Sequence, residues 1–207
     1  MTFIEYIFLD QLKKNTSNFK VVGAEKVIRI IQSGKQVVFV SGHFANFELM
    51  SMEITKRNIK LATIYRPLNN IFLNPFMEIL RKKFICKNQI KKGLNGVRDA
   101  IEYIKNDFSI ALMIDQRVSE GEKINFYKKP ALTTTLPAQL ALKYKLSIIP
   151  VFIQRKSNNK FVLEFQNEIK SEDFHDKLEL TQKLNEVLEK MVVRNPSQWI
   201  WTHNRWK

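Results

Sequence analysis

Residues 36–48 read Gln-Val-Val-Phe-Val-Ser-Gly-His-Phe-Ala-Asn-Phe-Glu, an apolar, β-branched run followed by a glycine and a new pattern. The run 36–40 predicts a buried strand, and Gly42 permits a tight turn directly after it. Large apolar residues then recur at helical spacing: Phe44, Phe47 and Met50. This strand-turn-helix unit is typical of α/β folds. It places His43 beyond the carboxyl end of a strand, where open α/β sheets bind their ligands.

The same alternation of strands and helices continues along the chain. Strands are expected at 19–22, 36–40, 61–65, 108–114, 147–154 and 160–166, and helices at 3–14, 24–32, 44–57, 74–83, 93–106, 133–144 and 178–193. The last two strands are expected to form a hairpin at the sheet edge, and residues 117–130 a mobile loop. The pattern predicts one α/β domain over residues 1–207, with a mixed, mostly parallel central sheet flanked by helices on both faces.

His43 and Glu48 form a candidate catalytic pair. Five residues turn a helix by about 500°, so the two side chains meet only if His43 precedes the helix and Glu48 reaches back from its early turns. A neutral imidazole accepts a proton from an attacking hydroxyl at pH 7, and a carboxylate on the other ring nitrogen fixes its tautomer. With such a base the acceptor hydroxyl attacks a thioester directly, without a Ser or Cys nucleophile. A His-to-Glu spacing alone often arises by chance, so the surrounding residues decide its meaning.

The octet 41–48, SGHFANFE, resembles the GHF-G-N-(W/F)-E box of the bacterial lipid A acyltransferases, which belong to the lysophospholipid acyltransferase superfamily. Four more segments are similar to motifs of that family, in the same order: YRPLNN at 65–70, IDQ at 114–116, IPVF at 149–152 and QWIWTHNRWK at 198–207. Ala45 departs from the usual glycine, which matters only if the position needs a positive φ. Because members usually carry a membrane-anchoring helix before the first strand, we expect an N-terminally short member.

The resemblance implies a glycerol-3-phosphate acyltransferase-like core and a specific O-acyltransferase activity. The enzyme would move a fatty acyl chain from acyl carrier protein, or acyl-CoA, to a hydroxyl of a lipid A precursor, without a cofactor. In this interpretation His43 is the general base and Glu48 orients it. Acylation of another glycolipid or of a lysophospholipid is the nearest alternative. A non-catalytic basic module that binds anionic lipid or nucleic acid is the alternative from a different class.

Four further residues are candidate substrate contacts. Arg66 is expected to contact a phosphate or oxyanion, because a guanidinium offers fixed, bidentate geometry to anionic oxygens. Asp115 is expected to orient either Arg66 or a loop backbone, and the sequence does not choose between them. Asn46 and Gln116 are candidate hydrogen-bond donors near the substrate. The three histidines show no close ligand spacing, so no metal site is expected.

Composition restricts the choice of partner. Lysine and arginine number 34 against 20 acidic residues, which gives a net charge of +14. Zinc-finger, basic-zipper and RNA-recognition signatures are missing from the sequence, so nucleic acid is not expected as a partner. Basic clusters beside apolar runs suit an enzyme on an anionic membrane surface, here expected at the cytoplasmic face of the bacterial inner membrane as a peripheral protein. The single cysteine, Cys86, excludes an internal disulfide and is interpreted as a packing residue.

The two ends of the chain each leave two alternatives. The amphipathic helix at 3–14 either docks on the core or lies in a membrane interface, and docking is the commoner outcome. The tail holds Trp199, Trp201, His203, Arg205 and Trp206. It forms either an aromatic and basic edge at the level of lipid headgroups or a segment packed against the catalytic sheet, with His203 in a structural role.

Overall fold

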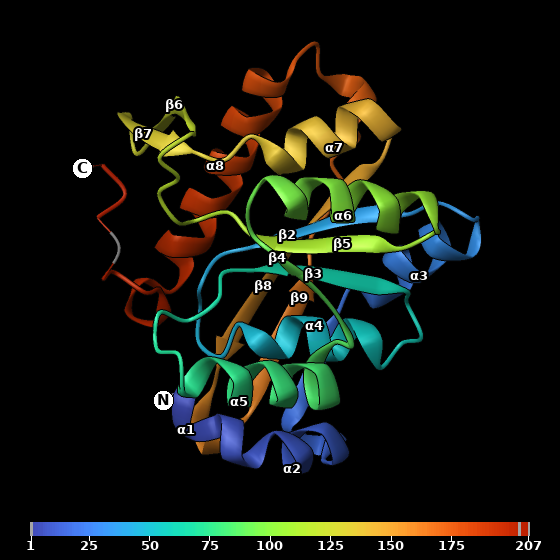
Figure 1. Cartoon of the computed structure of the whole chain (residues 1–207), viewed down its shortest axis with the longest axis vertical. Helices are drawn as coiled ribbons and strands as arrows, with labels where there is room; N and C mark the ends of the chain where they lie inside the picture. Colours follow the sequence, from blue (N-terminus) through green and yellow to red (C-terminus); the bar gives the residue numbers. More distant parts are fainter. Residues whose placement is uncertain (1, 203, 207) are drawn as a thin grey trace.

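The computed structural model describes residues 2–202 and 204–206, and its centre is a seven-stranded sheet in the order β1-β9-β8-β2-β5-β3-β4 (Figure 1). The strands are β1 (Phe19–Val22), β2 (Val37–Ser41), β3 (Leu61–Tyr65), β4 (Asn88–Lys91), β5 (Ser109–Met113), β8 (Ser147–Arg155) and β9 (Phe161–Phe165). Neighbouring strands are parallel except for the antiparallel pair β8–β9. The prediction of a mixed, mostly parallel sheet is confirmed.

Helices cover both faces of this sheet, as the alternating pattern predicted. Figure 1 shows α6, α7 and α8 on one face, and α4 and α5 with the N-terminal helices on the other. The helices are α1 (Thr2–Glu5), α2 (Leu9–Lys14), α3 (Ala24–Gln32), α4 (Glu48–Thr55), α5 (Leu73–Leu80), α6 (Leu94–Lys105), α7 (Leu136–Tyr144) and α8 (Lys177–Arg194). A π-helical turn, η3 (Arg81–Ile85), continues α5, and a 3-10 turn, η1 (Tyr6–Phe8), joins α1 to α2.

The core explains why β2 is central. All five residues of β2 are buried, which is the continuous apolar pattern of a strand covered on both faces. Burial extends to β5 and to the middle of β8, its two neighbours in the sheet. The carboxyl ends of these strands therefore continue from a strongly buried part of the sheet.

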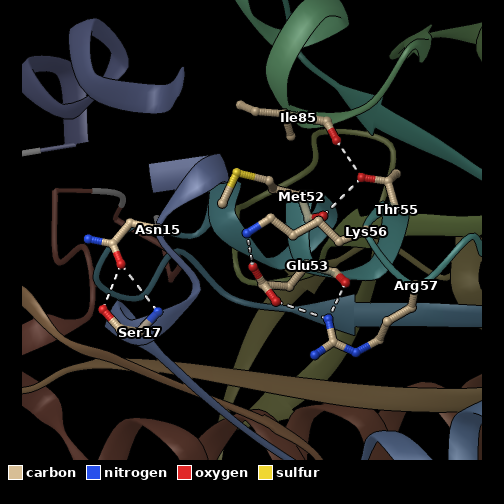
Figure 2. Close-up of polar contacts among 8 residues, drawn as sticks. All are labelled: Asn15, Ser17, Met52, Glu53, Thr55, Lys56, Arg57 and Ile85. Carbon is tan, nitrogen blue, oxygen red and sulfur yellow. Dashed lines mark hydrogen bonds and ion pairs between the residues drawn. The ribbon is translucent and has the colours of Figure 1, made fainter. Parts of the chain in front are cut away.

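Polar contacts fix the far end of α4, the helix that follows the glycine turn (Figure 2). The Thr55 hydroxyl lies 2.9 Å from the Ile85 carbonyl oxygen and so connects α4 to η3. Glu53 is 4% exposed, and its carboxylate accepts hydrogen bonds from Lys56 at 2.7 Å and Arg57 at 2.9 Å. These pairs lie one turn apart on the helix, where opposite charges stabilise it.

The N-terminal helices dock on the core through one side. Tyr6 and Leu9 are buried, at 4% and 1% exposed, which confirms the docking alternative for this segment. The turn after α2 is closed by Asn15, whose Oδ1 accepts from the backbone N–H of Ser17 at 3.2 Å and from its hydroxyl at 2.6 Å (Figure 2). Among the side chains that the structure describes in these helices, Ile4, Ile7 and Phe8 are large, apolar and exposed.

Two predicted elements were wrong in part. Residues 117–130, predicted as a mobile loop, include most of an antiparallel hairpin, β6 (Glu122–Phe126) with β7 (Lys129–Thr133). Its turn residues Tyr127 and Lys128 have φ of 50° and 60°. Turns with positive φ at both central residues usually carry Asn-Gly, and the Tyr-Lys pair found here gives no such signal. The hairpin of β8 and β9 forms as predicted, but away from the sheet edge, because β1 pairs with the outer side of β9.

Two further differences from the prediction concern the start of α4, after the glycine turn, and the strand at the β4 edge of the sheet. Helix α4 begins at Glu48 and not at Phe44, because Ala45 has a φ of 46°, which interrupts a right-handed helix. Strand β4, which forms the other edge of the sheet, was not predicted. Its sequence, Asn-Gln-Ile-Lys, is short and largely polar, and so lacks a strand signal.

Candidate active site

The register of β2 against β5 brings His43 and Asp115 together. Ser41 and Met113 are partners across the two parallel strands, so the residues two positions further along each chain also lie side by side. The backbone N–H of Ile114 donates to the Ser41 carbonyl at 2.9 Å and extends this pairing beyond the strands. The carboxyl end of a parallel strand pair thus builds the site, at the place that the sequence indicated for His43.

Asp115 is almost fully enclosed by hydrogen-bond donors. Its Oδ1 lies 2.7 Å from Nδ1 of His43, and its Oδ2 accepts from the His43 backbone N–H at 2.7 Å and from Trp199 Nε1 at 2.9 Å. The carboxylate is 3% exposed. Burial on its own would raise the pKa of Asp115, but the charge of His43 and these hydrogen bonds hold the pKa below its usual value. Asp115 therefore stays ionised beside the imidazole.

The His43 ring presents its other nitrogen to a cavity. With Nδ1–H donating to Asp115, Nε2 carries the lone pair that can accept a proton. Nε2 lies 3.4 Å from the side-chain nitrogen of Gln116, and both residues line the cavity. Phe47 packs edge-to-face against the ring at 4.5 Å between centroids. The imidazole is thus held on two sides, in an orientation that leaves Nε2 available to accept a proton.

Glu48 does not occupy the position beside His43 that the sequence predicted. Its Oε1 accepts from Arg81, at 2.9 Å from Nε and 2.7 Å from Nη2, and from the Tyr6 hydroxyl. The reason is geometric: because α4 begins only at Glu48, this side chain faces η3 and the N-terminal helices, while the preceding turn directs His43 toward β5. The carboxylate on the imidazole comes from Asp115, and Glu48 belongs to a buried ion pair in the cavity wall.

The remaining candidate residues divide between the cavity and the core. Arg66 follows β3 and lines the cavity, as does Gln116. The described partners of Asp115 are His43 and Trp199, so of the two roles left open for it, contact with a loop backbone is the one observed. Asn46 is fully buried and donates to Glu5 Oε2 at 2.8 Å, in a structural position.

Two tail residues shape the site and were not assigned a role there from the sequence. The tail pairs with the glycine turn, because Ala45 donates to the Gln198 carbonyl at 2.9 Å and Ile200 to the His43 carbonyl at 3.1 Å. This places the buried indole of Trp199 against Asp115. The similarity of the tail to a family motif was the available signal, but it carried no indication of what Trp199 contacts.

Arg205 is the second of these residues. It is 0% exposed and donates to the Ile114 carbonyl at 3.1 Å and to Asn185 Oδ1 at 2.6 Å. Burial lowers the pKa of Arg205 to about 10, which leaves it charged at pH 7. The packing alternative for the tail is therefore correct at Trp199 and Arg205, while Trp201 is 56% exposed and His203 lies outside the described residues.

The cavity has a volume of about 850 Å³, and both polar and apolar side chains line it. We call the group His43, Arg66, Lys92 and Gln116 its polar end. A second group of lining residues, here called the apolar arm, is buried and comes from β5, α4, α5 and η3: Met50, Met77, Ile85, Ala111 and Leu112. Partial burial and the nearby charge of Arg66 lower the pKa of Lys92, so two basic side chains lie close together at the polar end. The arrangement suits an amphiphilic substrate with an anionic head.

Comparison with known proteins identifies the family. The model of the bacterial lipid A biosynthesis acyltransferases matches residues 1–207. The chain belongs to this family. It is therefore an O-acyltransferase, and the sequence resemblance is confirmed. A search of curated proteins finds no significant match.

A solved structure supports the fold of this acyltransferase independently. The 1-acyl-sn-glycerophosphate (LPA) acyltransferase PlsC from Thermotoga maritima superposes with a TM-score of 0.55 at 17% identity, over 93% of this chain and 81% of that one. At this identity the likeness concerns the fold alone. Within the described residues, every helix is too short or too polar to cross a membrane.

Proposed function

We propose that this acyltransferase moves a fatty acyl chain from acyl carrier protein to a hydroxyl of a lipid A precursor, with His43 as the general base. The observation that carries the proposal is the orientation of His43, whose Nδ1 is bound to Asp115 while its Nε2 faces a cavity with an apolar arm. Family membership supports the lipid A precursor as acceptor. The proposed location is the cytoplasmic face of the inner membrane, where such acyl donors and lipid precursors meet.

The proposed reaction needs one base and no covalent enzyme intermediate. His43 Nε2 takes the proton from the acceptor hydroxyl as its oxygen attacks the thioester carbonyl carbon. The tetrahedral oxyanion then collapses, the C–S bond breaks, and the imidazolium returns its proton to the leaving thiolate. The products are an ester and a free thiol. Asp115 acts as a positioning residue, because it fixes the tautomer and stabilises the imidazolium that forms.

The cavity offers a subsite for each end of the substrates. The apolar arm can bury an acyl chain, which gains about 0.8 kcal/mol for each methylene removed from water. At the polar end, the guanidinium of Arg66 and the ammonium of Lys92 can bind phosphate oxygens. Both phosphopantetheine and a phosphorylated glycolipid carry such groups, so these two side chains are proposed to hold the anionic part of a substrate beside His43.

Thiol release and product mass together test this proposal. Purified protein is mixed with acyl carrier protein loaded with a fatty acid and with a lipid A precursor, and we expect stoichiometric thiol and a lipid that is heavier by one acyl group. His43→Ala serves as the inactive control. Thiol release with a lysophospholipid acceptor alone would assign the alternative acceptor, and no acyl transfer with any of these acceptors would exclude the proposed function. Lipid A mass spectra from cells with and without the gene test the same assignment in vivo.

A further inference from the structure

The outer face of α5 and the residues just before it form an exposed apolar surface, here called the α5 ridge and defined as Ile71, Phe72, Phe76 and Ile79. Their exposed fractions are 75%, 86%, 52% and 62%. Phe72, Phe76 and Ile79 recur at helical spacing, so they share one side of the helix. Single exposed apolar residues are ordinary, but a contiguous group of this size indicates a surface that is covered by a partner.

The inner face of the same helix belongs to the catalytic cavity. Met77 is 2% exposed and lines the apolar arm, and Glu78 accepts a hydrogen bond from the Tyr65 hydroxyl at 2.7 Å. Residues 66–69, which line the cavity, are separated from the ridge by one residue, Asn70. Helix α5 is thus a wall with the proposed acyl chain subsite on one side and the ridge on the other. A partner that covers the ridge lies beside the cavity.

Charge identifies the chemistry of that partner. Lys82 and Lys83 follow the ridge in η3 and are exposed, and Lys87 is exposed shortly after them. A row of aromatic and aliphatic side chains followed by lysines is the pattern by which amphipathic helices enter the headgroup region of an anionic leaflet. The N-terminal helices, linked to η3 through Tyr6 and Arg81, expose further apolar residues.

We propose that the α5 ridge inserts into the headgroup and upper acyl region of an anionic lipid leaflet, and that Lys82 and Lys83 contact its phosphates. This placement deepens the proposed function, since a lipid acceptor would reach the cavity from the same leaflet without crossing water. The expected insertion is shallow because only one side of one short helix takes part.

Vesicle binding with matched variants tests the ridge. The triple variant Phe72→Ser, Phe76→Ser, Ile79→Ser is compared with a control triple variant, Val22→Ser, Leu178→Ser, Val193→Ser, which changes three exposed apolar residues on β1 and α8. On vesicles of phosphatidylglycerol and phosphatidylcholine at low salt, we expect the ridge variant to bind at least about tenfold more weakly, and the control to bind within about twofold of the unmodified protein. Equal losses in the two variants would overturn the proposal.

Insertion and charge are then measured separately. Brominated lipid should quench the added fluorescence of Phe76→Trp more than that of Val193→Trp. The double variant Lys82→Gln, Lys83→Gln should bind less than the control double variant Lys35→Gln, Lys170→Gln. Equal quenching would exclude insertion, and a ridge variant that lost self-association but kept vesicle binding would identify a second copy of the chain as the occupant.

Turnover distinguishes this inference from the proposed function. With a detergent-dispersed acceptor, the ridge variant should keep the rate of the unmodified protein, and with the acceptor embedded in vesicles it should be slower in proportion to its lost binding. A ridge variant equally slow in both assays would show that the ridge serves the active site and not a membrane. If the unmodified protein transferred no acyl group, the proposed function would fail while the vesicle measurements still tested the ridge.

Discussion

At the scale of single residues, Asp115 and Glu48, the two carboxylates considered as partners of His43, differ in their hydrogen-bond donors. Asp115 accepts from the His43 ring, the His43 backbone and Trp199, whereas Glu48 accepts from Arg81 and Tyr6. A buried ion pair that loses one partner leaves an uncompensated charge, which costs about 3–5 kcal/mol of stability. We therefore expect a change at Asp115 to act on turnover as well as on stability, and a change at Glu48 to act mainly on stability.

The first prediction separates these roles by substitution. His43→Ala should lower kcat by about 10² to 10⁴, the usual contribution of a positioned acid–base group. Asp115→Asn should lose a comparable factor because the amide no longer fixes the tautomer with Nδ1–H. Glu48→Gln should lose less kcat but lower the midpoint of urea unfolding, because Arg81 stays buried without its counter-charge. A larger loss of kcat in Glu48→Gln than in Asp115→Asn would restore Glu48 as the partner of the base.

The second prediction concerns Arg66, which lines the polar end of the cavity. Lysine keeps the charge but not the planar fork that binds two oxygens at once, so Arg66→Lys should raise KM and lower kcat/KM by about tenfold or more. Steady-state kinetics with a phosphorylated acceptor measures this, and Arg98→Lys, at an exposed position of α6, is the matched control. A full rate with lysine would mean that Arg66 supplies only a general positive charge.

The third prediction follows from the lowered pKa of Asp115. A carboxyl group whose pKa is lower in the folded state stabilises the protein above its unfolded pKa of about 3.9, and this contribution disappears as the pH falls through the folded value. The free energy of unfolding should therefore decrease as the pH drops below about 4. In Asp115→Asn the free energy of unfolding should decrease less over this pH range, and in Asp99→Asn it should decrease as in the unmodified protein. Urea titrations at several pH values measure the slopes, and parallel slopes in all three proteins would contradict the assignment.

At the scale of elements, the turn between β2 and α4 carries a local conformational cost. Ala45 has a φ of 46°, in the left-handed region that costs an L-residue about 1–2 kcal/mol. The turn is kept because it lets the tail pair with residues 43–45 and directs His43 toward Asp115. The resemblance had marked this position as the place where glycine is usual, and the positive φ gives the physical reason.

The fourth prediction tests that reason. Ala45→Gly removes the strain at Cβ. Glycine also raises the conformational entropy of the unfolded chain, which costs about 0.4–1 kcal/mol of stability, so the net effect should be a stabilisation on the order of 0.5 kcal/mol. Asn58→Gly is the control, because Asn58 also has a positive φ, 58°, and asparagine tolerates it better than alanine. Urea unfolding at constant m-value should show a higher free energy of unfolding for Ala45→Gly and a smaller increase for Asn58→Gly. A destabilised Ala45→Gly protein would show that the methyl group packs usefully.

The sequence predicted where the strands end better than it predicted which strands lie next to each other. Apolar runs ending at His43, Arg66 and Asp115 were enough to place all three at the carboxyl ends of strands. The pairing of β2 with β5, which makes Asp115 and not Glu48 the partner of His43, depends on strand order, and no local pattern encodes strand order. The contact of Trp199 with Asp115 spans 84 residues and is equally invisible to a local reading.

At the scale of the whole molecule, the net charge of +14 and the apolar surfaces act together. Both the α5 ridge and the exposed residues of the N-terminal helices lie on the sheet face that also carries α4 (Figure 1). Each lysine or arginine near an anionic leaflet contributes about 1 kcal/mol of attraction, over about one Debye length. Charge should thus bring the molecule to the surface, and the apolar side chains should fix its orientation there.

The last prediction concerns the salt dependence of this attachment. The protein should co-sediment with anionic vesicles at low ionic strength and bind zwitterionic vesicles poorly, because shallow insertion without charge attraction is weak. At about 0.5 M salt the Debye length falls to roughly 4 Å, so most of the protein should leave the vesicles. Sedimentation across a salt series measures the release, with pure phosphatidylcholine vesicles as the control. Retention at high salt would contradict the electrostatic account and would point to a deeper hydrophobic anchor or to a protein partner in the membrane.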